Sequence, residues 1–290
     1  MKDYIKSFLL RFKYSDSDSE FLLSAWDSIE ADHSASSAFK HVYDSYCESV
    51  DIDYNASNVA IQGAAREAGV HDYTATFLMY IVLSQRLEQL YIQRGIDNSI
   101  FYESMKDLSF KLKECKEVKG IVGTFTNWFP GFYKFTRFAL GRLQFELTEA
   151  KYDYTDGVNS VKVGDTVINM HIPSSGEPLT PEAADESFAL AKEFFRDSFD
   201  TEYIPFVCSS WLLHPINDHI LPEKSNIRAF KNRFVILSHK LDLGENLWRF
   251  FGTDEKNPER LPANTSLRRA YVEHLKAGGR TGSAYGIFFK

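Results

Sequence analysis

The stretch INMHIPSSGEPLTPEAADESFALAKEFF, residues 168–195, decides the fold of the second half of the chain. Ile168, Met170 and Ile172 alternate with polar residues, and this period of two predicts a half-buried strand. Thr180 follows as a helix N-cap, with a proline at the first helical position behind it. A strand, a short loop and a helix in this order are typical of a layered domain in which helices pack on a sheet.

The loop between strand and helix contains Ser174, Ser175 and Gly176, which either hold a phosphate-bearing ligand or merely turn the chain. A helix N-terminus offers unpaired N–H groups and favours an anion by about 1 kcal/mol. The same helix end, however, already carries four carboxylates: Glu177, Glu182, Asp185 and Glu186. No Lys or Arg lies between Lys162 and Lys192. The residues alone therefore favour a simple turn from strand to helix, with Thr180 as the N-cap of the helix.

The elements on either side of this stretch predict an α+β domain. RLQFELTEAKYDY (142–154) and VGDTVINMHIP (163–173) alternate as two strands of a hairpin, joined by an Asp-Gly turn. Downstream, IPFVCSSW, RFVILSH and SAYGIFFK indicate strands, whereas SNIRAFKN and SLRRAYVEHLKAGG indicate helices. Upstream, an aromatic helix is expected from Trp128 to Gly141. This order predicts a mixed sheet with flanking helices.

Residues 1–118 show helical periodicity instead, with Phe21, Leu22, Ala25 and Ile29 on one face. The glycines of VKGIVGTFTN mark a boundary near residue 118. We therefore expect two domains, a helical bundle over residues 1–118 and an α/β-like domain over residues 119–290. A chain of 290 residues is long enough for both cores.

Composition excludes several classes of protein. A formal net charge of −7 and a pI near 5.7 argue against a nucleic-acid partner. Three scattered cysteines form neither a disulfide framework nor a zinc motif, and His214 and His219 are wrongly spaced for a metal pair. We find no signal-peptide pattern and no membrane span, so a cytoplasmic protein without a membrane partner or metal is expected. The oligomeric state is left open.

Five polar residues share one face of the predicted hairpin: Arg142, Gln144, Glu146, Asn169 and His171. A register that pairs Tyr152 with Val161 would set Arg142 opposite His171. One interpretation is a polar cleft floor, in which Glu146 or His171 takes a proton from an amine while the other residues contact the substrate. The other is an ordinary solvent-facing side of a hairpin.

Cys208, Ser209, Ser210 and Trp211 end the next strand, where ligands gather in open α/β sheets. Cys208 is a candidate nucleophile, the two serines are candidate cofactor contacts, and Trp211 is a candidate substrate platform. The alternatives are a cysteine and a tryptophan that only pack in the core.

Three stretches resemble a known family: LGRLQFE (140–146), residues 168–195, and FVCSSWLLHPINDHILPEKSNIRAFKNRF (206–234). They resemble the GNAT-like C-terminal domain of bacterial acyltransferases, which follows a helical N-acyltransferase N-terminal domain. The resemblance implies a GNAT-like fold and an acyl-CoA donor such as acetyl-CoA. It also implies an amine acceptor that attacks the thioester directly. The loop PSSGEPL (173–179) would then hold the pyrophosphate, although only Gly176 matches the family pattern Q/R-x-x-G-x-G/A. The alternative is a GNAT-derived module that binds a small ligand or a protein without catalysis.

Overall fold

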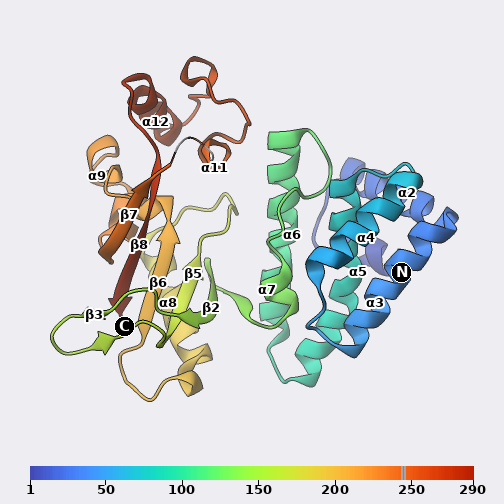
Figure 1. Cartoon of the computed structure of the whole chain (residues 1–290), viewed down its shortest axis with the longest axis horizontal. Coiled ribbons are helices and arrows are strands. Elements are labelled where there is room, and N and C mark those ends of the chain that lie inside the picture. Colours follow the sequence, from blue (N-terminus) through green and yellow to red (C-terminus); the bar gives the residue numbers. More distant parts are fainter. Residues whose placement is uncertain (243, 245) are drawn as a thin grey trace. The chain divides into compact units, whose positions relative to one another are not determined.

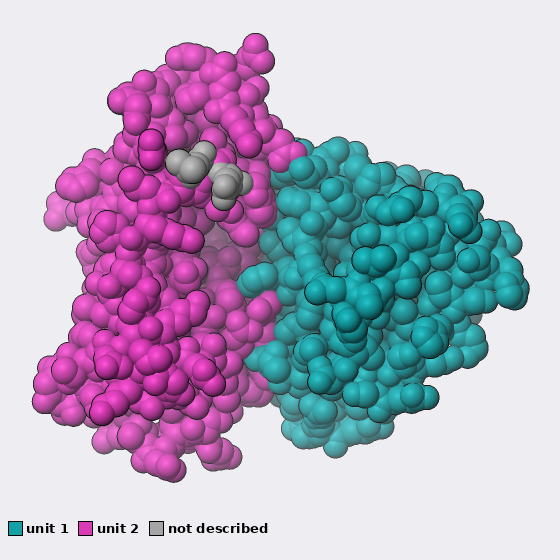
Figure 2. Space-filling view, in the orientation of Figure 1, with its two compact units in different colours: residues 1–136 teal, residues 137–290 magenta. Residues whose placement is uncertain are grey.

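In the computed structural model, which describes residues 1–242, 244 and 246–290, the chain forms two compact units. They comprise Met1–Thr136 and Arg137–Lys290 (Figure 2). The first unit is helical and the second is built on a mixed sheet (Figure 1). This confirms the predicted fold class.

The first unit contains seven helices within its described residues: α1 (Lys2–Arg11), α2 (Asp16–Ala31), α3 (His33–Glu48), α4 (Tyr54–Glu67), α5 (Asp72–Gln93), α6 (Asn98–Lys119) and α7 (Pro130–Tyr133). Helix α5 lies at the centre and contacts α1, α2, α3, α4 and α6. Every residue from Thr74 to Ser84 is buried, because this part of α5 is covered on all sides. The apolar run at 77–83 is thus the core of a bundle.

The expected domain boundary at residue 118 falls at the end of α6, whereas the units divide after Thr136. The intervening segment is bonded to the helices of the first unit. Thr74 donates from Oγ1 to the carbonyl of Val122, at 2.8 Å, and Tyr80 donates from its hydroxyl to Asn127 Oδ1, at 3.0 Å. Loss of helical period at residue 118 therefore marks the end of a helix within the unit.

The second unit contains the strands β1 (Arg137–Leu140), β2 (Leu143–Glu149), β3 (Tyr154–Thr155), β4 (Ser160–Val161), β5 (Thr166–His171), β6 (Pro205–Ser210), β7 (Val235–Leu241) and β8 (Gly282–Phe289). Its helices are α8 (Pro181–Phe194), α9 (Asn217–Ile220), α10 (Asn226–Lys231), α11 (Leu247–Phe251) and α12 (Ser266–Lys276). The main sheet has the order β1-β2-β5-β6-β8-β7, and β3 pairs with β4 separately. β5 and β6 run parallel, whereas the other neighbours in the main sheet are antiparallel.

The two faces of the main sheet are covered differently. On one face, Phe188 of α8 packs against Phe145, Phe206 and Phe288, with ring centroids 5.0 to 6.3 Å apart. On the other face, Val161 of β4 joins a cluster of buried residues that includes Val167, Val207, Tyr285 and Ile287. Strand β5 contributes to both faces, with Ile168 and Met170 on the α8 side and Val167, Asn169 and His171 on the opposite side.

Two local predictions were wrong. The expected aromatic helix is reduced to α7, because Phe135 has a left-handed φ of 56° and turns the chain into β1. The hairpin register is also shifted by two residues, since Val161 pairs with Tyr154 and His171 pairs with Gln144. A shift of two keeps each side chain on its predicted face.

Candidate active site

The parallel strands β5 and β6 form a short ladder that ends at their carboxyl ends. Their pairing runs from Ile168 with Phe206 to Met170 with Cys208. Beyond it, β6 continues to Ser210 along β8, while β5 ends at His171 and leads into the loop at 172–180. Ligands of open α/β sheets bind where adjacent strands lead away from each other at this edge.

The loop and helix after β5 have the geometry expected from the sequence. Thr180 caps α8 by accepting a hydrogen bond from Ala183 N, and Pro181 is the first helical residue. Ser174 is exposed, Ser175 is half-buried and accepts a bond from Glu177 N, and Gly176 has a φ of 84°. A Cβ there would meet nothing within 4 Å, so the positive φ favours glycine at residue 176 and crowding does not.

Four side chains from three adjacent strands form one network on the sheet face opposite α8. His171 Nε2 lies 2.7 Å from Glu146 Oε1, and Asn169 Nδ2 donates to the same oxygen at 3.1 Å. Arg137 of β1 donates to Glu146 Oε2 from Nε at 3.2 Å and from Nη2 at 2.9 Å. Glu146 thus lies between a guanidinium and an imidazole.

The surroundings of the pair fix its charge states. Burial acts to raise the pKa of Glu146, but the hydrogen bond with His171 and the charge of Arg137 outweigh it and lower the pKa to about 2. Burial lowers the pKa of His171, and Glu146 opposes this only in part. At neutral pH an ionised carboxylate therefore accepts a hydrogen bond from a neutral imidazole, which places the proton on Nε2 and a lone pair on Nδ1.

Arg137 was not predicted from the sequence, because residues 128–141 were interpreted as a helix. The signal was the two-residue turn at Gly141 and Arg142, which joins Leu140 to its partner Leu143. A glycine in a two-residue loop between alternating segments is typical of a tight hairpin. With that hairpin, Arg137 pairs with Glu146.

The other predicted residues of the hairpin are placed differently. Gln144 is 1% exposed and lies on the network's face, opposite His171. Arg142, expected to contact the substrate, instead turns toward the loop. Its guanidinium donates to the carbonyls of Pro173 and Glu177.

Cys208 lies on the other side of the sheet from His171. Its partner Met170 points toward α8, so the thiol does too. The side chain is fully buried, and burial raises the pKa of Cys208 to about 12. A protonated, enclosed thiol is not a nucleophile at neutral pH, so we leave Cys208 out of the chemistry.

Ser209, the next residue, points to the same face as His171 and is exposed. Ser210 caps the following turn by accepting a hydrogen bond from Leu212 N. Trp211 packs with its ring 4.4 Å from Phe250, within the cluster formed by α11 and α12.

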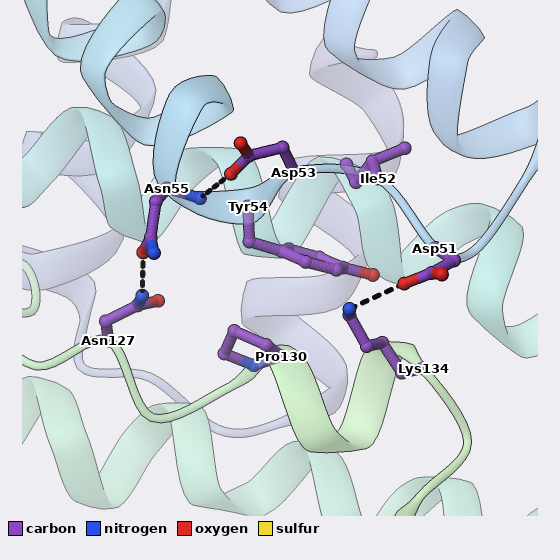
Figure 3. A pocket seen from close by; sticks show the side chains of 8 residues that line it. All are labelled: Asp51, Ile52, Asp53, Tyr54, Asn55, Asn127, Pro130 and Lys134. Carbon is purple, nitrogen blue, oxygen red and sulfur yellow. Dashed lines mark hydrogen bonds and ion pairs between the residues drawn. The ribbon is translucent and has the colours of Figure 1, made fainter.

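The first unit has a hollow of about 420 Å³ between the start of α4 and the segment around α7 (Figure 3). Its charged and amide groups bind one another. Lys134 Nζ lies 2.6 Å from Asp51 Oδ1, and Asn127 Nδ2 donates to Asn55 Oδ1 at 2.6 Å. Asp53 caps α4. We place the candidate site in the second unit, because the carboxyl ends of the parallel strands β5 and β6 lie there.

Among the described residues, no three His, Cys, Asp or Glu side chains are grouped as a metal site would require. Within the same residues, none of the helices combines the length and the apolar character needed to cross a bilayer.

Comparison with known proteins agrees with this architecture. Residues 138–288 match the family model described as the GNAT-like C-terminal domain, and residues 3–135 match the N-acyltransferase N-terminal domain. The second unit therefore defines a GNAT-like protein. The chain belongs to the family that carries the GNAT-like C-terminal domain, and the resemblance noted in the sequence is confirmed.

Two solved structures have the same fold across almost the whole chain. An acyltransferase in complex with decanoyl-CoA and teicoplanin is 22% identical, with a TM-score of 0.77, and the match covers 98% of this chain and 86% of that one. A mutant acyltransferase in complex with octanoyl-CoA is 23% identical, with a TM-score of 0.77 and coverage of 98% and 87%. No curated protein matches this chain.

Proposed function

We propose that this protein is an acyl-CoA-dependent N-acyltransferase. The observation that carries the proposal is the contact between Glu146 of β2 and His171, the last residue of β5, which directly precedes the loop and helix α8. Family membership and the acyl-CoA complexes of the similar structures support it.

In the proposed reaction the acceptor amine attacks the thioester carbonyl carbon directly. A C–N bond forms, the C–S bond breaks, and CoA leaves as its thiol once it has gained a proton. His171 accepts the proton that the amine nitrogen loses, through Nδ1, while Nε2 donates to Glu146. Arg137 keeps Glu146 ionised, so the carboxylate stabilises the imidazolium that forms.

The donor would bind with its pyrophosphate at the loop containing Ser174, Ser175 and Gly176 and its thioester near Ser209. Gln144 and Asn169 would line the floor beside the acceptor. The resemblance to GNAT-like acyltransferases suggests acetyl-CoA, whereas the similar structures hold octanoyl-CoA and decanoyl-CoA. One of these structures also contains teicoplanin, so amines on large molecules belong in the acceptor panel.

The test is a thermal-shift series with acetyl-, octanoyl- and decanoyl-CoA, followed by release of CoA thiol with an amine panel. A ligand at 100 times its Kd stabilises the folded state by about 2.7 kcal/mol, which is easily measured. His171→Ala should keep the thermal shift and lose transfer. The proposal fails if no acyl-CoA shifts the melting temperature at millimolar concentration.

A thermal shift without thiol release with any amine would favour the alternative, a GNAT-derived module that binds without catalysis. A cytoplasmic location and independence from metal ions are also part of the proposal. Activity that persists after EDTA treatment would support the second of these.

A further inference from the structure

The guanidinium of Arg142 is bonded to two points of the loop that follows β5, residues 173 and 177. Nη1 donates to the carbonyl of Pro173 at 3.2 Å. Nε and Nη2 donate to the carbonyl of Glu177 at 3.2 and 2.8 Å. These two carbonyls bracket the Ser-Ser-Gly segment at 174–176, so one side chain fixes the span of that segment.

Arg142 is itself anchored to helix α8. Its backbone N–H donates to Ser187 Oγ at 2.7 Å, and that hydroxyl donates to the carbonyl of Ala183 at 2.8 Å. The preceding Gly141 has a φ of 67°, and a Cβ there would lie 2.7 Å from Ser187 Oγ. Hydrogen bonds therefore join three neighbouring segments: the turn between β1 and β2, the loop after β5, and the first turns of α8.

This arrangement directs the loop backbone. The chain has no cis peptide bond among its described residues, and in a trans peptide the C=O and N–H point in opposite directions. Because the carbonyl of Pro173 faces Arg142, the N–H of Ser174 points away from it. The guanidinium thus fixes the direction of one backbone N–H, that of Ser174, whereas the carbonyl of Glu177 precedes Pro178, which has no N–H.

The same side chain changes the charge balance of the loop. The loop contains no Lys or Arg, but Arg142 brings a permanent positive charge to within hydrogen-bonding distance of its backbone. Asp185, one of the four acids at this helix end, is paired with Arg233 at 2.5 Å and with Lys290 at 3.4 Å. The helix end is therefore less negative than its sequence indicates.

We propose that Arg142 is a positioning residue that holds the loop at 173–177 in the conformation that binds the pyrophosphate of the donor, a role that rests on the proposed acyl-CoA activity. It acts from the far side of the loop and does not contact the substrate. Arginine is required because only a planar group with several donors can reach both carbonyls.

The test compares two donors with the same acyl group, acyl-CoA and acyl-pantetheine, which lacks the pyrophosphate. Arg142→Gln should lower kcat/KM for acyl-CoA by about 10- to 100-fold and leave kcat/KM for acyl-pantetheine unchanged. Arg142→Lys keeps the charge but cannot span both carbonyls, so it should behave like Arg142→Gln. Arg196→Gln is the matched control, because Arg196 is exposed and donates to the carbonyl of Thr201 elsewhere in the unit.

Equal losses with both donors, or full activity in Arg142→Lys, would overturn the positioning role. Calorimetric titration with free CoA separates this outcome from failure of the proposed function. If the parent protein binds CoA without transferring an acyl group, a Kd raised about tenfold or more in Arg142→Gln still supports the inference. An unchanged Kd refutes it. If the parent protein does not bind CoA, both proposals fall.

Discussion

Replacing Glu146 by Gln tests the charge state of the candidate site without any substrate. The substitution keeps the shape of the side chain and removes the charge that lies between Arg137 and His171. A carboxyl whose pKa is lowered in the folded protein stabilises the fold above its unfolded pKa, and this contribution is lost as the pH falls through the folded pKa. For Glu146 the loss lies between the ordinary value of 4.5 and about 2.

The magnitude follows from these two pKa values. A decrease from 4.5 to about 2 would correspond to about 3 kcal/mol, at about 1.4 kcal/mol for each factor of ten in acidity. The side chain of Glu146 is 19% exposed, and screening by solvent reduces such energies. We therefore expect Glu146→Gln to lower the free energy of unfolding by about 1 to 2 kcal/mol at pH 7.5. At pH 3.5 the difference should be smaller by about a third to a half.

The measurement is urea-induced unfolding, followed by tryptophan fluorescence at both pH values. The free energy of unfolding is compared between the parent protein and Glu146→Gln, for the transition that the substitution shifts. Glu149→Gln is the control, because Glu149 ends the same strand and is exposed. The reasoning is refuted if Glu146→Gln costs the same at pH 7.5 and pH 3.5. It is equally refuted if Glu149→Gln reproduces the effect.

Three further predictions concern single residues. His171→Ala should reduce kcat by about 10²- to 10⁴-fold. It should also abolish the acidic limb of the pH–rate profile, which in the parent lies below 6.5, the ordinary pKa of histidine. An unchanged profile would exclude His171 as the base. Gly141→Ala should lower the free energy of unfolding by about 2 kcal/mol, since alanine is strained at positive φ and its Cβ meets Ser187; urea titration measures this. Cys208 should resist iodoacetamide at pH 8 in the native protein and react after unfolding, as peptide mass spectrometry can show; rapid native labelling would contradict its burial.

The fold was largely predictable because its signals are local. The strand, loop and helix at 168–195 are encoded by alternation, a threonine cap and a proline at the first helical position. The segment at 128–141 was mispredicted because its local signal, the spacing of its aromatic residues, is that of a helix. Its aromatic residues have helical spacing, but the left-handed backbone of Phe135 divides it into a short helix and a strand. A positive φ in a bulky residue is stabilised by tertiary contacts that periodicity cannot reveal. Here the guanidinium carbon of Arg94 lies 3.9 Å from the centre of the Phe135 ring.

The candidate site was partly predictable because strand faces depend on parity. The assumed register was wrong by two residues, yet Glu146, Asn169 and His171 still share a face, since a shift of two preserves it. The sequence left open whether Glu146 or His171 accepts the proton. Our proposal that His171 accepts it rests on Arg137, whose charge favours an ionised Glu146 beside the imidazole. That information depends on the pairing of β1 with β2, which the mispredicted helix concealed.

The loop after β5 contains no Arg or Lys, but the pairing of the strands brings Arg142 next to it. The family pattern provides an Arg or Gln within the loop itself, whereas this loop has neither. Because β2 runs antiparallel to β5, the start of β2 lies beside the end of β5, with Gln144 opposite His171. The turn that precedes β2 must then lie next to the loop that follows β5. A long side chain at residue 142 can reach that loop from outside its sequence, as the contacts of Arg142 do. Absence of the motif from the loop is therefore a weak argument against donor binding.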